Sequence, residues 1–270
     1  GGLTAGFLFE KLINRIGGAT TDTNGDIGDF SVGTYLTFGH AAAASSMADW
    51  FHADLLLIWH RNPAYTAIPF HHYIAEARYR GAEVATIAPD YSPSAMHADY
   101  YLGVRPGADA ALALSMARVI VDEGLMDEAF VRSQTDLPLL VRGDNGRFLC
   151  AADLEEGGRA DQFFVWSRAK SAVAPASRER LEANEDAALD GSFAVTLVDG
   201  ATVEVRPVFA LLRAVLAAYA PEDAAPACGV HPDTIRLMAR KVASKRTAVL
   251  LGFNSAKYYH GDLMERAMCV

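Results

Sequence analysis

The chain has few cysteines, no long apolar run and no cluster of basic residues. Its three cysteines, Cys150, Cys228 and Cys269, are scattered and form no C-x-x-C pair, so neither a disulfide framework nor a zinc or iron–sulfur site is expected from them. They are predicted to be small core residues. The apolar runs "ADLLLIW" and "TAVLLGF" are much shorter than the about 20 residues of a membrane helix. With a formal net charge of −9 and no run of Lys or Arg, neither nucleic-acid binding nor direct membrane insertion is expected.

What remains is the composition of a folded protein. At 270 residues and 51% hydrophobic side chains, the chain can bury a sizeable core as one large domain or two smaller ones. It opens at "GGLTAGFLFE" without an initiator Met and stops at "GDLMERAMCV" inside a helical pattern. We therefore expect a fragment of a longer polypeptide.

The first half alternates helical and strand patterns. Helices are predicted at 3–16, ended by the glycine pair 17–18, and at 67–80 and 109–123. Strands are predicted at 55–59, at 84–88 and in "YYLGVRPGAD", the first as an apolar run buried on both faces. This order predicts an α/β fold with a doubly wound, mostly parallel sheet and flanking helices, as in dinucleotide-binding domains. Ligands of such sheets bind at the carboxyl ends of the strands, where "HRNP", "APDYS" and "RPGAD" are expected to meet.

The second half is less regular and predicts parts of a second α/β domain. The pattern loosens from 126 to about 205 and ends in a candidate β-hairpin around Asp199-Gly200. Helices are expected at 207–219 and 231–243, followed by a buried strand in "TAVLLGFN" and a last helix after "SAKYYHGD".

Two aspartates near the predicted strand ends suggest a nucleotide ligand. Asp90 follows a buried strand and Asp109 opens a helix, so each is able to accept hydrogen bonds from a ribose or a guanine edge. For Asp109 a helix N-cap is an equal alternative. Neither the G-x-G-x-x-G nor the G-x-x-x-x-G-K-[ST] pattern is present, which disfavours an ordinary NAD or ATP site.

Other polar residues allow more than one interpretation. Asp26 and Asp29 in "TNGDIGDF" are candidates for an acid–base pair, a metal site or simple turn formers, and the turn is favoured from the pattern alone. Lys257 is either a lysine with a perturbed pKa or a solvated loop residue. His60 and the pair at 71–72 lack an H-x-x-x-H partner and are expected to be structural, and no hydrolase triad is found.

An ordered series of motifs resembles a known family over essentially the whole chain. The motifs are "IGGATTDTNGDIGD", "LLLIWHRNP", "EARYRGAEVATIAPDYSPSAMHADYYLGVRPGADAAL", "TDLPLLVR", "GRFL", "CGVHPDTIRLMARKVA" and "NSAKYYHGDLMER". The series is similar to the catalytic alpha subunits of the molybdopterin oxidoreductases of the dimethyl sulfoxide reductase family. The aspartate-ligated branch fits best, and within it the ethylbenzene and steroid side-chain dehydrogenases look closest.

The resemblance implies that the segment "TNGDIGDF" carries a metal ligand. It implies that Asp29 is the molybdenum ligand, since a hard carboxylate suits a high-valent metal, and that Gly28 leaves room for the cofactor. Asp26 would orient the loop. Lys257 matches a lysine near the active centre, where it would steady Asp29 or a group bound to the metal.

The resemblance also supplies the ligand for the strand-end loops, a Mo-bis(molybdopterin guanine dinucleotide) cofactor. It implies that Asn62 meets the phosphate or pterin region, that Asp90 and Ser92 meet a ribose or guanine, and that Asp109 meets the guanine amino edge. Gly107 is the remaining cofactor-binding candidate. This chain departs from the family pattern at two positions: the family commonly has Gly where His60 stands and Thr where Ala108 stands. The first loop is therefore bulkier, and a hydroxyl contact is lost.

For the whole protein, the resemblance implies a molybdenum enzyme that passes electrons to iron–sulfur clusters. Residues 1–47 and 231–270 would belong to the metal-site domain, the second part truncated, and 48–230 would form the dinucleotide-binding domain. A [4Fe–4S] cluster would lie in an N-terminal domain before this chain. Partners would be an iron–sulfur beta subunit and a haem b gamma subunit, and a periplasmic location in anaerobic metabolism is expected, with the cytoplasmic side as the alternative.

The reaction expected from the closest branch is water-dependent hydroxylation of a hydrocarbon or steroid-like side chain. The alternatives within the family are nitrate, selenate or chlorate reduction and dimethyl sulfide dehydrogenation. A different class of function is a non-catalytic nucleotide-binding remnant. The fragment alone is expected to be inactive.

Overall fold

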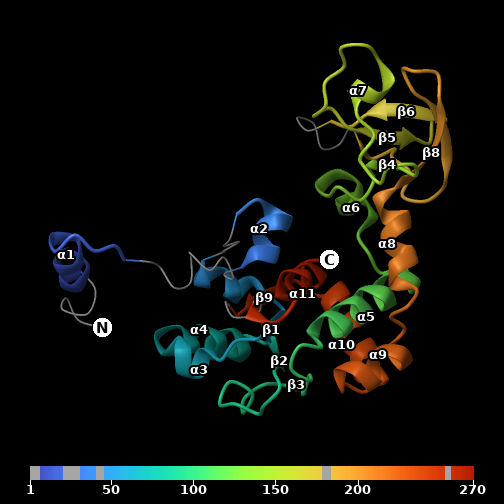
Figure 1. Ribbon diagram of the computed structural model, residues 1–270. Helices are drawn as coiled ribbons and strands as arrows, with labels where there is room; N and C mark the ends of the chain where they lie inside the picture. The colour runs from blue at the N-terminus through green and yellow to red at the C-terminus, as the bar shows by residue number, and fades with distance from the viewer. Residues whose placement is uncertain (1–6, 21–30, 41–45, 178–183, 253–256) are drawn as a thin grey trace. The chain divides into compact units, whose positions relative to one another are not determined.

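The computed structural model describes residues 7–20, 31–40, 46–177, 184–252 and 257–270 (Figure 1). Its contacts divide the chain into two compact units. Unit 1 comprises residues 1–113, 228–230 and 245–270, and unit 2 comprises residues 114–227 and 231–244. No helix within the described ranges is long and apolar enough to span a membrane. The assignment of 1–47, 48–230 and 231–270 to metal-site and cofactor domains stays a prediction.

Unit 1 is built on a parallel four-stranded sheet. Its strands are β1 (Leu55–Trp59), β2 (Glu83–Ile87), β3 (Tyr100–Leu102) and β9 (Thr247–Leu251). Its helices are α1 (Phe7–Arg15), α2 (Val32–Phe38), the 3-10 helix η1 (Met47–His52), α3 (Pro63–Thr66), α4 (Ile68–Tyr79), α11 (Gly261–Met268) and the first turn of α5 (Asp109–Asp122). The sheet confirms the predicted α/β class, and its three N-terminal strands lie where the sequence predicts them.

The strand order is β3-β2-β1-β9, with every neighbouring pair parallel. Leu55 pairs with Glu83 of β2 on one side and with Thr247 of β9 on the other. The chain thus steps outward from β1 to β2 and β3, and returns much later to add β9 on the opposite side. In doubly wound sheets a reversal of this kind is the switch point beside which ligands bind.

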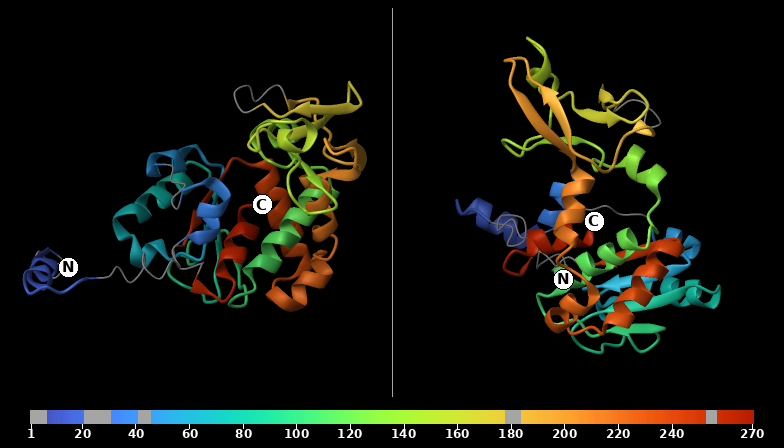
Figure 2. Two further views of the ribbon diagram at one scale, coloured as in Figure 1. Left: turned by 45° about the horizontal axis from the view of Figure 1, so that its top comes forward. Right: turned by 90° about the vertical axis from the view of Figure 1, so that its right-hand side faces the viewer.

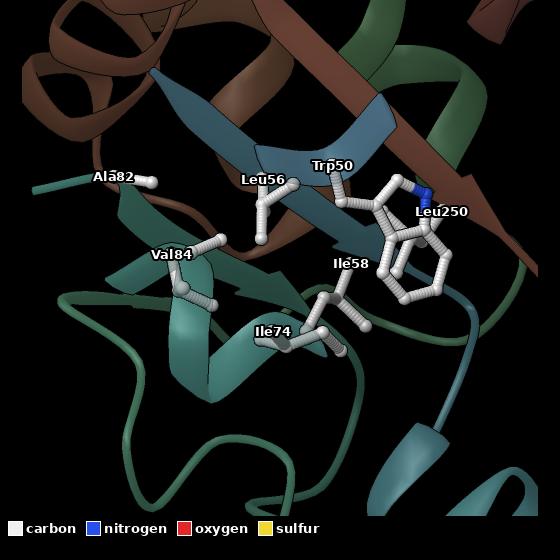
Figure 3. Close-up of a cluster of buried hydrophobic side chains, with 8 residues drawn as sticks. Trp50, Leu56, Ile58, Ile74, Ala82, Val84 and Leu250 are labelled. Carbon is white, nitrogen blue, oxygen red and sulfur yellow. The ribbon is translucent and has the colours of Figure 1, made fainter. Parts of the chain in front are cut away.

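The core of unit 1 forms where helices cover one face of this sheet (Figure 3). Alternate residues of a strand point to opposite faces, so Leu56 and Ile58 share one face of β1. Figure 3 shows them packed with Ile74 of α4 and Trp50 of η1. Burying such side chains contributes about 1.5–3 kcal/mol each, which fixes the register of the central strand.

Helices α2 and α11 pack closely through Gly33. A Cβ atom at this position would lie within 3.0 Å of the Asp262 carbonyl oxygen and the Glu265 Cβ atom. Only glycine therefore lets the two helices approach this closely. The contact joins segments that are separated by more than 200 residues of sequence.

Unit 2 contains two small antiparallel sheets, with strand order β4-β8-β7 in one and β5-β6 in the other. The strands are β4 (Leu140–Arg142), β5 (Phe164–Ser167), β6 (Ala172–Pro175), β7 (Phe193–Thr196) and β8 (Thr202–Pro207). The helices are the remainder of α5, α6 (Glu128–Gln134), α7 (Ala151–Leu154), α8 (Val208–Leu216), α9 (Pro221–Cys228) and α10 (Pro232–Ser244). The predicted hairpin around Asp199-Gly200 is confirmed as β7–β8, drawn in orange in Figure 2.

Some local predictions need correction. The strand in "TAVLLGFN" exists as β9 but is not buried throughout: Leu250 is buried, whereas Val249 is 55% exposed, so the described residues leave its face of this edge strand uncovered. Among the cysteines only Cys228 is buried, while Cys150 and Cys269 are partly exposed. Several elements were not predicted: η1, α2, α3, α6, α7, α9, β4, β5 and β6.

Candidate functional site

The carboxyl ends of the four parallel strands bring the sequence-predicted polar residues to one edge of unit 1. His60 and Asn62 follow β1, Asp90 and Ser92 follow β2, and Asp109 follows β3. The segment after β9 includes Gly252 and, beyond a stretch outside the described residues, Lys257. The sheet therefore brings the three loops expected from the sequence to one edge, and the segment after β9 joins them there.

Asp109 is the most deeply placed of these residues. Its side chain is 0% exposed, and its Oδ1 accepts a hydrogen bond of 2.8 Å from the indole N–H of Trp59. Its Oδ2 is buried and has no hydrogen-bond partner among the described residues. The carboxylate thus faces the end of β1, and the N-cap alternative is not the contact that the structure gives it. A buried carboxylate oxygen without a donor is costly and rare in a folded protein, and often marks a binding position.

His60 lies directly in front of this carboxylate. Its Nε2 is 2.9 Å from Asp109 Oδ2, yet the contact does not have hydrogen-bond geometry, and both atoms lack a hydrogen-bond partner in the described part of the chain. The imidazole is 9% exposed and meets the ring of Tyr258 edge to face, at 5.8 Å between centroids. The side chain of His60 is therefore nearly buried against the Asp109 carboxylate, whereas the sequence predicted an ordinary structural histidine.

Asn62 connects the first two loops. Its Oδ1 accepts a 2.6 Å hydrogen bond from the Ser94 hydroxyl, and the Ser94 Oγ accepts a 3.0 Å bond from the backbone N–H of Ala64. Ser94 is 3% exposed, so this link is shielded from water. The side chain of Asn62 is thereby held in one orientation at the mouth of the site, with its amide nitrogen as the remaining donor group.

Asp90 and Ser92 lie on the second loop in different environments. Asp90 is exposed, whereas Ser92 is 9% exposed and its hydroxyl has no hydrogen-bond partner among the described residues. Burial, and next the negative charge of Asp90, raise the pKa of Tyr101, whose hydroxyl donates to the Ala88 carbonyl oxygen at 3.1 Å. The second loop thus offers an accessible carboxylate and a buried hydroxyl that is free to bond a ligand.

Gly107 and Lys257 complete the predicted set within the described residues. Gly107 has φ of 78°, a left-handed conformation that favours glycine, and a Cβ atom added there would lie 3.8 Å from the Tyr258 ring. Lys257 lies in an exposed turn before α11. Gly28, Asp26 and Asp29 lie outside the described residues, so their predicted roles stay predictions. Within the described ranges no group of three or more His, Cys, Asp or Glu side chains is arranged to hold a metal ion.

Sequence reasoning missed three residues of this site: Trp59, Ser94 and Tyr258. Trp59 had a usable signal, because an indole N–H at the end of a buried strand needs an acceptor nearby. The roles of Ser94 and Tyr258 depend on contacts with residues 32 and 198 positions away in the sequence, which no local pattern reveals.

Unit 2 carries a separate cleft of about 690 Å³. Trp166 and Phe193, stacked at 4.0 Å between ring centroids, contribute to its wall. The guanidinium groups of Arg132 and Arg213 also line it, and they are paired with Glu128 and Asp190. None of the predicted site residues lies in this cleft, and its paired charges give no anion site. The candidate site is therefore the sheet edge of unit 1.

The groups at that edge suit a heterocyclic ligand with hydrogen-bond donors and a sugar. A buried carboxylate accepts from N–H groups of a base, while Asp90 and the Ser92 hydroxyl match ribose hydroxyls. A hydrogen bond to a charged acceptor contributes about 1.5–3 kcal/mol. Asp109 Oδ2 is therefore the strongest hydrogen-bond acceptor that the described residues offer a ligand at this edge.

Comparisons with known proteins identify the family of the chain. The family described as Molybdopterin oxidoreductase matches residues 2–269. The chain is 38% identical over 267 residues to the dimethylsulfide dehydrogenase subunit alpha of Rhodovulum sulfidophilum, covering 96% of this chain and 28% of that protein. It is 36% identical over 294 residues to the perchlorate reductase subunit alpha of Dechloromonas aromatica, covering 98% and 31%.

The fold has a counterpart among solved structures. Acetylene hydratase from Pelobacter acetylenicus matches with a TM-score of 0.54 at 18% identity, over 90% of this chain and 23% of that one. The chain spans about three tenths of the length of three of the curated relatives that it matches. From the match over residues 2–269, the chain belongs to the molybdopterin oxidoreductase family.

Proposed function

We propose that this chain is part of the catalytic subunit of a molybdenum oxidoreductase, and that the sheet edge of unit 1 holds one guanine dinucleotide arm of a Mo-bis(molybdopterin guanine dinucleotide) cofactor. The single observation that carries the proposal is the fully buried carboxylate of Asp109, whose Oδ2 has no hydrogen-bond donor among the described residues. In a chain of this family, such an acceptor at the end of a parallel strand fits the amino edge of guanine.

The described residues fit the nucleotide part of the cofactor. Two buried polar atoms without partners, Asp109 Oδ2 and Ser92 Oγ, lie on neighbouring loops of the same edge. Gly107 adds a turn where a side chain would be strained. These groups therefore match the hydrogen-bonding groups of a base and a ribose.

Each residue has a proposed task. Asp109 accepts from the guanine N–H groups, Asp90 and Ser92 bind a ribose or guanine, and Asn62 donates its amide N–H to a phosphate or pterin oxygen. Trp59 keeps the Asp109 carboxylate in place through its hydrogen bond to Oδ1. Asp29 is proposed as the metal ligand, beside Gly28, with Lys257 close to it. When bound, the cofactor would supply two-electron redox chemistry, in which the transferred oxygen atom comes from water or ends in water.

For the reaction, we propose water-dependent hydroxylation of a hydrocarbon or steroid-like side chain, with electrons passing to iron–sulfur clusters. This proposal depends on the resemblance of "RNPAYTAIPFHHYIAEARYRGAEVATIAPDYSPSA" and "SAKYYHGDLMERA" to the corresponding dehydrogenases. The alternative is oxyanion reduction or dimethyl sulfide oxidation. It is favoured by the 33–38% identity to proteins named dimethylsulfide dehydrogenase, perchlorate reductase and chlorate reductase.

The remaining properties follow from the same family. The relatives are named as alpha subunits, so we propose beta and gamma partners, an iron–sulfur and a haem b subunit. We further propose a [4Fe–4S] cluster in a domain preceding this sequence and a periplasmic location.

The cofactor assignment is tested on the holoenzyme, purified anaerobically from a host that makes the cofactor. Metal content is measured by mass spectrometry, and GMP is measured after acid hydrolysis. We expect one Mo and two GMP per wild-type molecule. Asp109→Asn, which removes a carboxylate oxygen from the acceptor site, is expected to retain less GMP, whereas Asp29→Ala is expected to retain GMP and lose turnover. Asp199→Asn, in the unit 2 hairpin turn, is the matched control.

Absence of both Mo and GMP from the wild type would contradict the oxidoreductase proposal and favour a nucleotide-binding remnant. Unchanged GMP in Asp109→Asn would contradict the role of that residue alone. The reaction is tested by dye reduction with alkylbenzene, steroid and dimethyl sulfide substrates, against chlorate, selenate and nitrate reduction. Oxyanion turnover without hydrocarbon-dependent dye reduction would rule out the hydroxylase.

A further inference from the structure

His60 occupies a backbone position that suits glycine. Its φ is 56°, in the left-handed region that a residue with a Cβ atom adopts at a cost. The chain continues from β1 into this conformation with the His60 N–H bonded to the Ile87 carbonyl oxygen at 3.2 Å. Across the sheet, a Cβ atom on Gly252 would lie within 3.0 Å of the His60 carbonyl oxygen. The fold thus accommodates a histidine where the backbone alone favours glycine, which indicates a task for the side chain.

The side chain covers the open oxygen of Asp109. Nε2 of His60 lies 2.9 Å from Asp109 Oδ2, and the ring also meets Tyr258 edge to face. Oδ1 already accepts one hydrogen bond from Trp59, so Oδ2 is the carboxylate oxygen with more acceptor capacity left for a ligand. Oδ2 is itself buried, so a ligand reaches it only if a covering group moves.

The covering contact is weaker than the one a base would make. His60 and Asp109 are close but not aligned as a hydrogen bond. Guanine presents adjacent N1–H and N2–H groups, which reach a carboxylate along its lone pairs as charge-assisted hydrogen bonds. Adenine presents one amino donor next to the acceptor N1, which a carboxylate repels. Exchange of imidazole for guanine is therefore favourable, and exchange for adenine is not.

We propose that His60 is a displaceable cover of the Asp109 acceptor, which sets the affinity and the selectivity of the site for guanine over adenine. The proposal depends on the proposed function, in which Asp109 binds the guanine edge. In the ligand-free protein the imidazole occupies the position in front of Oδ2. When the nucleotide binds, the ring turns away from Oδ2 and the two guanine N–H groups take its place.

The first test measures binding of GMP and AMP to the full-length apoprotein, purified from a host that cannot make the cofactor, by isothermal titration calorimetry. His60→Gly and His60→Ala both remove the ring, and only the glycine also removes the backbone strain. We expect both variants to bind GMP about tenfold more tightly than wild type, because the nucleotide no longer has to displace the imidazole from the Asp109 carboxylate. His52→Gly, at an exposed histidine on η1, is the matched control and should bind GMP as wild type does.

The second test needs no variant and uses wild-type apoprotein. Diethyl pyrocarbonate modifies accessible imidazoles, and peptide mass spectrometry reports the modified fraction at each histidine. His60 is buried without ligand, so we expect GMP to increase its modification, AMP to leave it unchanged, and neither to affect the exposed His52. GMP protection of His60, or weaker or unchanged GMP binding by the His60 variants, would overturn the displacement.

Asp109→Asn separates this inference from the proposed function. Wild-type GMP binding that is lost in Asp109→Asn supports the nucleotide site whatever the His60 variants do. Absence of GMP binding in wild type and in every variant would overturn both the site and its cover.

Discussion

Glu265 of α11 places its carboxylate at the start of α2, where Oε2 accepts a hydrogen bond of 2.8 Å from the Gly33 N–H. A second bond of 3.4 Å comes from the Thr34 N–H, and the Glu265 side chain is 0% exposed. Ser31, the residue that precedes α2, makes no side-chain capping bond. The first amide groups of α2 are thus capped from a different helix, and the negative charge also suits the positive end of the helix dipole.

Replacing Glu265 tests this cap. Glu265→Ala leaves buried N–H groups without an acceptor, and we expect the free energy of unfolding to fall by about 2 kcal/mol. Glu265→Gln keeps one acceptor oxygen and should lose about half as much. Urea unfolding followed by circular dichroism measures both. Equal stability of Glu265→Ala and wild type would show that the cap contributes nothing.

Gly33→Ala tests the close approach of α2 and α11. The added methyl group would press on the Asp262 carbonyl oxygen and on Glu265 within 3.0 Å. Overpacking of this kind costs about 1–3 kcal/mol. The control is Gly103→Ala, where the new Cβ atom would meet only the Tyr101 ring at 3.5 Å and we expect a change within about 0.5 kcal/mol. Thermal unfolding that ranks the two substitutions in the opposite order would contradict the prediction.

Trp59→Phe tests the support of Asp109. The phenyl ring fills much of the indole volume but donates no hydrogen bond, so Asp109 Oδ1 is left buried without a partner. We expect a loss of about 1–3 kcal/mol in chemical unfolding. Trp166→Phe, which keeps a ring stacked on Phe193, is the control and should cost clearly less. Similar losses for both would mean that ring volume, and not the hydrogen bond, matters at Trp59.

Asp99 gives a prediction on pH. Burial opposes its ionisation, but the bonds from the Val84 N–H at 2.8 Å and from Arg78 at 3.1 Å outweigh it, and the pKa of Asp99 lies below its usual value. A carboxyl group with a lowered pKa stabilises the fold above its unfolded pKa, and this contribution is lost as the pH falls through the folded value.

We therefore expect Asp99→Asn to be about 1 kcal/mol less stable than wild type at pH 7, and the difference to disappear at pH values below the folded pKa. Urea titrations across the acidic range measure it. Asp199→Asn, at a turn that accepts either residue, is the control for the effect of an Asp-to-Asn change on stability at pH 7. A difference that stays constant with pH would indicate a loss of packing and not of charge.

The sequence was sufficient wherever the pattern was local. The run from Leu55 to Trp59 is fully buried because its apolar side chains face both sides of a central strand, and the Asp199-Gly200 turn forms a hairpin. The family was also predictable, since the motifs are ordered along the chain.

The rest depends on contacts that sequence patterns do not encode. α2 is only seven residues long, and its cap comes from Glu265, more than 200 positions away. The closeness of His60 to Asp109 follows from the pairing of strands and a left-handed residue after β1. Asp29 and Gly28 lie outside the described residues, so the metal part of the site stays a prediction.

The placement of β9 beside β1 also determines the order of events during synthesis. Leu55 finds its partner Thr247 only after nearly 200 further residues have been made, roughly 10 to 40 s at ribosomal rates. During that time β1 can pair with β2, while its other edge offers unpaired backbone N–H and C=O groups to any strand that arrives. Unit 2 is made in this interval, and its own folding shortens the loop whose closure brings β9 to the sheet. A mutation in unit 2 that slows its folding therefore prolongs the exposure of β1. Such a mutation, far from the sheet, would increase aggregation during synthesis.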